Sequence, residues 1–432
     1  MRKTLMTILV SGLVLASCSQ KQGSDNPLLQ TWDTPFETAP FEKIKVEHYL
    51  PAFEAAMAEH DKEIQAIIDN AEAPTFDNTI AALDYSGQTL TKVAGVFYNM
   101  MAANTSEELQ KVNEQIGPMM ATHSDNVSMN AKLFEKIKAV YDAKDSQKYT
   151  GEQLALLEKT YKQFVRSGAL LDAEKQAELR EVNAELTKVE AKFDANLLKE
   201  TKSYQLVIDN QENLKGLPQG ELEKAAVLAK QEGKEGKWIF TLDNPSFIPF
   251  VTYADNRDLR KEIFNARVNR CNNGGETDNN ALVAQMSELR AKKAQLLGYE
   301  TFAHYQLEER MAKEPKAVFD LLENLLSYSV KVAKEEAAQF QAMLSKDVPG
   351  AKLEAWDMYY YAEKVRQQKY NFDAELTRPY FEINNVRQGC FDVLTKLYGI
   401  SFTERKDISV YAEDVLAFEA KNEKGEHVGI LY

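Results

Sequence analysis

The histidines are the first residues of this chain to consider for metal chemistry, because neutral imidazole is a common zinc ligand. A zinc site needs three or four ligands that converge on one ion, and two of them commonly lie one helical turn apart. The five histidines are His48, His60, His123, His304 and His427. The nearest pair, His48 and His60, is 12 positions apart, so neither His-x-x-x-His nor His-Glu-x-x-His occurs. We therefore expect surface or hydrogen-bonded histidines, and no catalytic or metal-binding residue in this chain.

Nucleophilic and nucleotide chemistry have no supporting motif either. The sequence lacks a Gly-x-Ser-x-Gly motif, and neither Cys271 nor Cys390 has a neighbouring cue for thiolate activation. The glycine-rich segments 233–236 and 272–275 match neither the Walker A nor the dinucleotide-binding pattern, so we interpret them as turns. We expect the two cysteines to be separate thiols.

Three consecutive tyrosines at 359–361 form the most promising group for ligand contact. A phenolic hydroxyl can bind a peptide carbonyl or stabilise an oxyanion. Successive helical residues point about 100° apart, so at most two of the three can share one surface. The alternative is structural: Trp356 and one tyrosine anchor the core, while Glu363 pairs with Arg366 or Lys364 at the surface.

Two apolar stripes predict the long helices that would position such residues. One stripe comprises Leu50, Phe53, Met57, Ile64, Ile67 and Ile68, and the other comprises Leu179, Val182, Leu186, Val189, Phe193 and Leu197. The spacing of three and four is typical of amphipathic helices packed inside a domain. Asp172 precedes the second stripe as an N-cap, and Glu174 lies in the first turn, where the helix dipole favours an acidic residue.

Glycine and proline cluster at 210–236 and predict a break, which we interpret as a subdomain junction. Residues 237–242 have strand character, and helices resume from Leu282 to a C-cap at Gly298. A further helix begins at Pro315. We therefore expect an N-terminal helical domain at 31–209 and a second part at 210–432.

The apolar period changes again after Gly399. Residues 410–419 predict a strand, 422–425 a turn and 427–432 a returning strand, which together form a terminal β-hairpin at 410–432. The returning strand leaves an apolar edge with nothing to cover it, and such edges aggregate. We therefore expect the 432 residues to be a fragment of a longer protein, with a frayed hairpin.

The first 17 residues predict an export signal. A basic start precedes an apolar run from Leu5 to Ala16, which is too short to span a bilayer comfortably. The tetrad at 15–18 is similar to a bacterial lipobox, so we expect Cys18 to carry lipid and residues 18–30 to form a polar tether. This anchor would place the protein in the bacterial cell envelope, facing the periplasm or the surface. The alternative is a plain secretory peptide with an incidental cysteine.

Composition indicates a folded, acidic protein. The formal net charge is -14, from 52 basic and 66 acidic residues, and 44% of the residues are hydrophobic. The apolar content suffices for a sizeable core, and no dense run of Lys and Arg indicates a nucleic-acid partner. No segment after the export signal approaches 18 uninterrupted apolar residues, so we expect no transmembrane helix.

A series of short segments in a fixed order carries a family resemblance. They are Asn26-Pro27-Leu28-Leu29, residues 47–53, residues 74–80, Gly236-Lys237-Trp238, residues 296–299, Arg310-Met311-Ala312, residues 356–366, residues 378–381 and residues 397–402. Together they resemble the M3 (thimet oligopeptidase) family of zinc metallopeptidases, and most closely its bacterial peptidyl-dipeptidase branch. The His-Glu-x-x-His zinc helix of that family does not occur here, so the resemblance identifies relatives without locating an active site.

The resemblance implies a mainly α fold, the N-terminal and middle part of a zincin-like peptidase whose helical lobes enclose a deep channel for short peptides. In such relatives zinc activates water and a glutamate acts as general base. This chain would supply channel walls, with Tyr360, Tyr361 and His304 as candidate substrate-channel residues, and alone would be inactive and zinc-free. The intact protein would be a zinc-dependent monomer that releases C-terminal dipeptides. The alternative is a non-catalytic helical lipoprotein that binds a ligand or partner.

Overall fold

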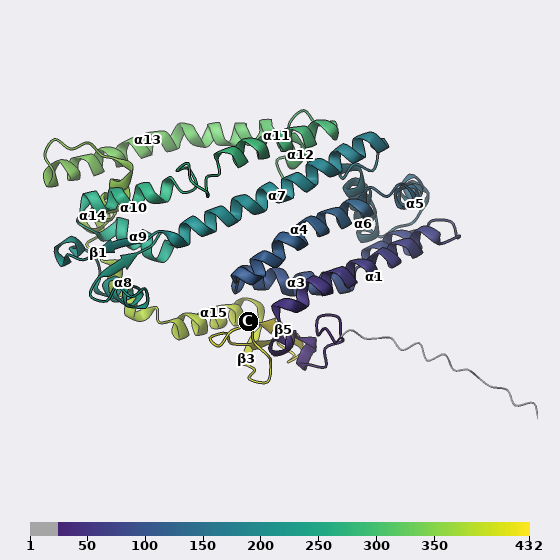
Figure 1. The fold of residues 1–432 in the computed structure, drawn as a ribbon, viewed down its shortest axis with the longest axis horizontal. Helices are drawn as coiled ribbons and strands as arrows, with labels where there is room; N and C mark the ends of the chain where they lie inside the picture. The colour runs from purple at the N-terminus through teal and green to yellow at the C-terminus, as the bar shows by residue number, and fades with distance from the viewer. Residues whose placement is uncertain (1–24) are drawn as a thin grey trace, which may run out of the picture.

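Long helices stacked side by side form most of the fold, and two small β-sheets complete it (Figure 1). The computed structural model describes residues 25–432. The predicted export signal at 1–17, the lipidation site Cys18 and most of the tether at 18–30 lie outside the described residues. The prediction of a mainly α chain is confirmed.

The helices follow one another with few interruptions. The first half contains α1 (Tyr49–Asp69), α2 (Ala82–Asp84), α3 (Gln88–Ala103), α4 (Glu107–Ser128), α5 (Ala131–Asp142), α6 (Gly151–Arg166) and α7 (Ala173–Ser203). The second half contains α8 (Gln219–Gln231), α9 (Asn244–Tyr253), α10 (Arg257–Val268), α11 (Asn280–Leu296), α12 (Phe302–Leu307), α13 (Pro315–Asp347), α14 (Met358–Tyr370) and α15 (Ile383–Tyr398). The strands are β1 (Leu206–Ile208), β2 (Trp238–Phe240), β3 (Ser401–Glu404), β4 (Phe418–Lys421) and β5 (His427–Leu431).

The two predicted apolar stripes become the buried faces of α1 and α7. In α1, Phe53 and Met57 pack with Leu28 and with residues of α3 and α4. In α7, the Asp172 side chain accepts a hydrogen bond from the Lys175 N–H and caps the helix as predicted. Helix α7 runs between α4 on one side and α11 on the other, which makes it the central support of this part of the molecule (Figure 1).

The segment 210–236 is more ordered than the sequence analysis predicts. It contains α8, a helix of 13 residues whose Ala225 and Ala229 are buried. Gly220 lies in the first turn of this helix, whereas Gly216 and Gly233 lie outside it and have positive φ angles of 87° and 69°. The segment therefore contains a short helix with glycine turns on either side, and the subdomain junction stays a prediction. The strand predicted at 237–242 is confirmed as β2, and it pairs antiparallel with β1, which the sequence analysis missed.

The second sheet corrects the predicted terminal hairpin. Strand β4 spans only Phe418–Lys421, and residues 410–417 form turns and irregular backbone rather than the expected strand. The turn before β5 is confirmed. The sheet also has a third strand, β3, which pairs with β4 on the side opposite β5. The local pattern missed β3 because a four-residue strand depends on its partner more than on its own sequence.

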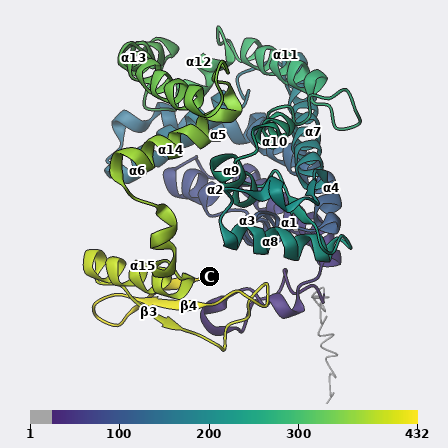
Figure 2. The same cartoon turned by 90° about the vertical axis from the view of Figure 1, so that its left-hand side faces the viewer.

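The N-terminal segment contacts both ends of β5, so the predicted apolar edge is covered only in part. Among the described residues β5 has no partner strand on its outer side, and Val428 and Leu431 are 55% and 43% exposed. The Phe36 ring stacks on the His427 ring with centroids 3.9 Å apart. The Phe41 ring contacts Tyr411 and Tyr432 edge-on, at 5.6 and 6.0 Å. Figure 2 shows the purple N-terminal segment beside the yellow strands. We call this contact between residues 35–43 and residues 409–432 the N-terminal clasp.

Two helices expose large apolar side chains instead of burying them. On α13 these are Phe319, Leu321, Leu322, Leu325, Leu326, Tyr328, Val330 and Val332, each at least 40% exposed. On α15 they are Ile383, Val386, Val393, Leu397 and Tyr398, and no residue of this helix is buried. Exposed apolar side chains gathered along a helix in this way are typical of interaction surfaces.

None of the helices formed by residues 25–432 combines the length and the apolar content needed to cross a membrane. The two cysteines described are separate thiols, as predicted: Cys271 is buried and Cys390 is exposed.

Replacing Phe41 with alanine should loosen β5. Of its two edge-on contacts, the one with Tyr432 acts directly on the end of β5, and an aromatic pair contributes about 0.5–1.5 kcal/mol beyond burial, so the local opening free energy of β5 should fall by about that amount. Hydrogen exchange followed by mass spectrometry should show faster exchange at 427–432 and unchanged exchange in α7. The control Phe319→Ala, on the exposed face of α13, should leave β5 unchanged. Wild-type exchange in Phe41→Ala would show that the N-terminal clasp does not hold the sheet.

Candidate functional site

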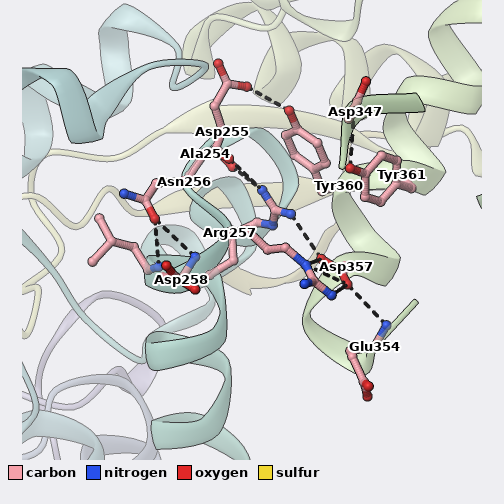
Figure 3. Close-up of polar contacts among 12 residues, drawn as sticks. Ala254, Asp255, Asn256, Arg257, Asp258, Asp347, Glu354, Asp357, Tyr360 and Tyr361 are labelled. Carbon is pink, nitrogen blue, oxygen red and sulfur yellow. Dashed lines mark hydrogen bonds and ion pairs between the residues drawn. The ribbon is translucent and has the colours of Figure 1, made fainter. Parts of the chain in front are cut away.

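The tyrosines singled out from the sequence lie in a buried polar network rather than on an open surface. Tyr360 is 7% exposed and its hydroxyl donates to Asp255 Oδ1 at 2.8 Å, while Tyr361 is 2% exposed and donates to Asp347 Oδ2 at 3.3 Å (Figure 3). Burial raises the pKa of Tyr361 to about 12. Both phenols are therefore neutral donors with an acceptor inside the protein, and their substrate-channel role stays a prediction.

Two tyrosines are buried because α14 packs against two helices. The Tyr360 hydroxyl points toward Asp255, which follows α9, and the Tyr361 hydroxyl points toward Asp347 at the end of α13 (Figure 3). Neighbours about 100° apart on a helix can thus each reach a different partner. Tyr359 points elsewhere and is 46% exposed. The structural alternative is confirmed for the tyrosines, with two buried in place of one. Trp356 is only partly buried and belongs to no core cluster of the described residues; Arg257 and Lys261 lie over its ring.

Asp357 is the charged centre of this network. Its carboxylate is fully buried and accepts hydrogen bonds from Arg257 Nε at 3.0 Å, Arg257 Nη2 at 2.7 Å and Arg260 Nη2 at 3.1 Å (Figure 3). The Glu354 N–H donates to Asp357 Oδ2 at 3.1 Å. Burial alone would raise the pKa of Asp357, but the hydrogen bonds and charges of the arginines hold it below its usual range. We call Asp357, Arg257 and Arg260 the aspartate clasp.

Arg260 carries the buried positive charge of the aspartate clasp. It is 1% exposed, and its Nη1 donates to the Ala254 carbonyl at 2.7 Å and to the Asp255 carbonyl at 3.1 Å. Its guanidinium lies over the Tyr360 ring, 3.9 Å from the centroid, a favourable cation–π position. With every carboxylate oxygen of Asp357 already bonded, this cluster is suited to holding helices together rather than to proton transfer with a substrate.

The ion pair predicted between Glu363 and a basic residue near the tyrosines is confirmed. Arg366 donates to both carboxylate oxygens of Glu363, from Nε at 2.7 Å and from Nη2 at 2.6 Å. Lys364 instead pairs with Asp347 Oδ2 at 3.2 Å. This bidentate pair lies one turn along α14 and stabilises the helix locally.

His304 lies apart from the tyrosines, on α12. Its Nδ1 is 2.9 Å from Thr301 Oγ1, and its Nε2 is 3.7 Å from Glu300 Oε2. The neighbouring Phe302 and Tyr305 line a cavity, but His304 does not. The structure therefore does not bring together the three candidate channel residues, and His304 as a channel residue stays a prediction.

A polar cavity lies beside α12, among the central helices. It has a volume of about 600 Å³ and is lined by residues of α4, α6, α7, α11 and α12. At its wall, Asn183 Nδ2 donates to both oxygens of Asp125 at 3.0 and 3.1 Å, and Lys293 Nζ donates to Asn183 Oδ1 at 2.8 Å. Sequence reasoning missed this polar cavity, because its residues come from five separate helices. We call it the central cavity.

A pair of histidines meets elsewhere in the fold. His60 Nδ1 of α1 lies 2.9 Å from His123 Nε2 of α4, His60 Nε2 lies 3.0 Å from Ser86 Oγ, and His123 Nδ1 lies 3.4 Å from a carboxylate oxygen of Asp61. Two facing ring nitrogens can share only one proton, so both rings cannot be fully protonated. The expectation of hydrogen-bonded histidines is confirmed for this pair, although 63 positions separate them.

Zinc does not fit the residues described. Within residues 25–432, no group of three or more His, Cys, Asp or Glu side chains is arranged to hold a metal ion. The facing nitrogens of His60 and His123 bond to each other and do not converge on a third point.

Comparison with known proteins points to one peptidase family. The sequence model of "Peptidase family M3" matches residues 250–432, and that of the "Neurolysin/Thimet oligopeptidase, N-terminal domain" matches residues 53–176. These two matches include the aspartate clasp, most of α1, all of α4 and the histidine pair.

Curated relatives are similar to the chain along almost its whole length. It is 34% identical over 408 residues to a dipeptidyl carboxypeptidase of Escherichia coli (strain K12), which covers 94% of this chain and 60% of that protein. It is 31% identical over 414 residues to oligopeptidase A of the same organism, covering 94% and 60%. It is 30% identical over 419 residues to organellar oligopeptidase A, chloroplastic/mitochondrial, of Arabidopsis thaliana, covering 95% and 52%.

The substitution Asp357→Asn should destabilise the fold by roughly 3–5 kcal/mol, because it leaves the buried Arg260 guanidinium without its counter-charge. Urea denaturation monitored by circular dichroism would measure this. The exposed pair Lys316–Asp320 supplies the control, since Asp320→Asn should cost less than about 1 kcal/mol. Pairing with the arginines lowers the pKa of Asp357. The stabilisation that the ionised carboxylate contributes to the fold is therefore fully present above about pH 4, and it is lost as the pH falls through the pKa of Asp357 in the folded state. If the free energies of unfolding of wild type and Asp357→Asn differ by less than about 1 kcal/mol at neutral pH, Asp357 does not stabilise the fold in this way.

The histidine pair should make stability depend on pH. Burial, followed by the nearby His123, lowers the pKa of His60, whereas Glu63 and Asp61 act in the opposite direction. Between the folded pKa and about 6.5 the unfolded chain binds more protons, so the free energy of unfolding should fall as the pH is lowered through this window. Urea midpoints at pH 7, 6 and 5 should show a shallower fall for His60→Gln than for wild type. In the control His304→Gln, the urea midpoint should depend on pH as in wild type. If the midpoint of His60→Gln also follows the wild-type pH dependence, the histidine pair is not the cause of that dependence.

Proposed function

Because the chain belongs to peptidase family M3, we propose that the whole protein is a zinc-dependent oligopeptidase of the peptidyl-dipeptidase type. It would hydrolyse short peptides and remove dipeptides from their C-termini. The similarity to a dipeptidyl carboxypeptidase over 94% of this chain is the observation that carries the proposal.

The chain spans about 60% of the length of the bacterial relatives it matches. Members of the family generally depend on zinc, and the described residues do not fit such a centre. We therefore propose that the metal ligands and the general base belong to polypeptide outside residues 25–432. In this arrangement the present chain supplies helical walls around the substrate and is inactive by itself.

The exposed apolar faces of α13 and α15 support this division of roles. Leu325 and Leu326 on α13 are 52% and 58% exposed, and Leu397 on α15 is 66% exposed. Soluble proteins rarely leave contiguous apolar surface of this kind facing water. We propose that the part of the whole protein that corresponds to the unmatched length of the relatives packs on these faces.

The alternative is a helical lipoprotein that binds a ligand without catalysis. The central cavity favours it, because a polar cavity of about 600 Å³ has the size of a small-molecule site. The lipid anchor at Cys18 and the location in the cell envelope stay proposals under either function, and the tetrad at 15–18 supports them.

The product of the complete reading frame, from Met1 to its stop codon, should cleave N-acetylated peptides of graded length. Mass spectrometry should find dipeptides released from the C-terminus, and a zinc chelator should abolish the release until zinc is restored. The 432-residue chain is the matched control and should show no turnover. No cleavage by the complete product, or cleavage that survives chelation, would exclude the zinc peptidase and favour the ligand-binding alternative.

A further inference from the structure

The central cavity holds two opposite charges that face it without pairing directly. Asp125 comes from α4 and Lys293 from α11, and both line the cavity. Among the residues that the structure describes, no Lys or Arg nitrogen lies within 4.0 Å of the Asp125 carboxylate, and no carboxylate lies within 4.0 Å of Lys293 Nζ. Asn183 of α7 lies between the two groups and bonds to each of them.

The Asp125 carboxylate has unused capacity to accept hydrogen bonds. Its two oxygens share one donor, the Asn183 amide, although a carboxylate can accept about four hydrogen bonds. Burial raises the pKa of Asp125, and the Asn183 hydrogen bonds together with the charges of Arg180 and Lys293 offset this only in part. A cation brought next to this carboxylate would remove the cost of its incomplete solvation.

The Lys293 ammonium is the complementary case. It donates one of its three hydrogens, to Asn183 Oδ1 at 2.8 Å. Burial lowers the pKa of Lys293, the positive charge of Arg166 acts in the same direction, and Asp125 and Glu190 offset these effects only in part. An anion at this position would supply that compensation.

The remaining charges of the cavity wall are already neutralised. Arg166 pairs with Glu308, and its Nη2 donates to the Tyr305 carbonyl at 2.8 Å. Arg290 Nη2 pairs with Glu190 Oε1 at 2.8 Å. Asp125 and Lys293 are therefore the two groups of the wall that would gain most from an external partner of opposite charge.

We propose that the central cavity binds a small zwitterion, a free amino acid or a dipeptide, with its ammonium group at Asp125 and its carboxylate at Lys293. Asn183 keeps the two protein charges apart, so that each can engage one end of the ligand. The volume of about 600 Å³ suits a ligand of this size, and the serine hydroxyls of Ser124 and Ser128 on the same wall suit its polar backbone. This binding involves no hydrolysis and does not rest on the proposed peptidase function.

Isothermal titration calorimetry of the 432-residue chain with alanyl-alanine and two blocked forms tests the proposal. Alanyl-alanine should bind, and either N-acetylation or C-terminal amidation should weaken binding at least tenfold. The variant Lys293→Met should lose the preference for a free carboxylate but keep the preference for a free ammonium group. Asp125→Asn should lose the preference for a free ammonium group but keep the preference for a free carboxylate.

Lys292→Met is the matched control, because Lys292 is adjacent on α11 but pairs with Glu178 at 2.8 Å and does not line the cavity. It should bind alanyl-alanine like wild type, and circular dichroism should confirm that each variant is folded. The proposal is overturned if the folded wild-type chain does not bind alanyl-alanine at millimolar concentration. It is equally overturned if the blocked forms bind as well as the free dipeptide, or if Lys292→Met weakens binding as much as Lys293→Met.

Discussion

A buried carboxylate between two arginines holds the second half of this molecule together. Asp357 stands immediately before α14, and both arginines belong to α10, about 100 positions earlier in the chain. A charge removed from water is unfavourable unless its hydrogen bonds are satisfied, and here the guanidinium groups and one backbone N–H satisfy them. The geometry of this clasp fixes where α14 begins, and thereby which tyrosines point to α9 and which to α13.

Helix α7 plays the corresponding part for the first half. Its apolar residues, such as Leu179 and Val182, are buried, while Asn183 and Glu190 on a neighbouring face turn to α11 and α4. A helix that is apolar on one side and polar on another can support a core and a cavity at once. In the aspartate clasp the opposite charges are in direct contact and join two helices. At the central cavity Asn183 separates Asp125 from Lys293, and the space between the helices stays open.

Local patterns predicted the elements well and their partners poorly. The apolar spacing of α1 and α7, the Asp172 cap and the start of α13 at Pro315 are all properties of a few neighbouring residues. The pairing of His60 with His123, the aspartate clasp and strand β3 depend on residues brought close only by folding. Spacing also cannot say whether a partner is present: the apolar residues of α13 predict a helix correctly, yet Phe319 and Leu325 face solvent.

The N-terminal clasp sets the order in which this chain can fold. Phe36 and His427 are in ring contact, so nearly the entire described chain forms a loop between them. Closing so long a loop early would cost conformational entropy with little compensation, whereas the local contacts within helices form rapidly. The clasp should therefore form last, after the helical stack has already brought residues 35–43 near β5. During synthesis on a ribosome, Phe36 and Phe41 emerge long before their aromatic partners, so their rings stay without these contacts until residues 411–432 have been made.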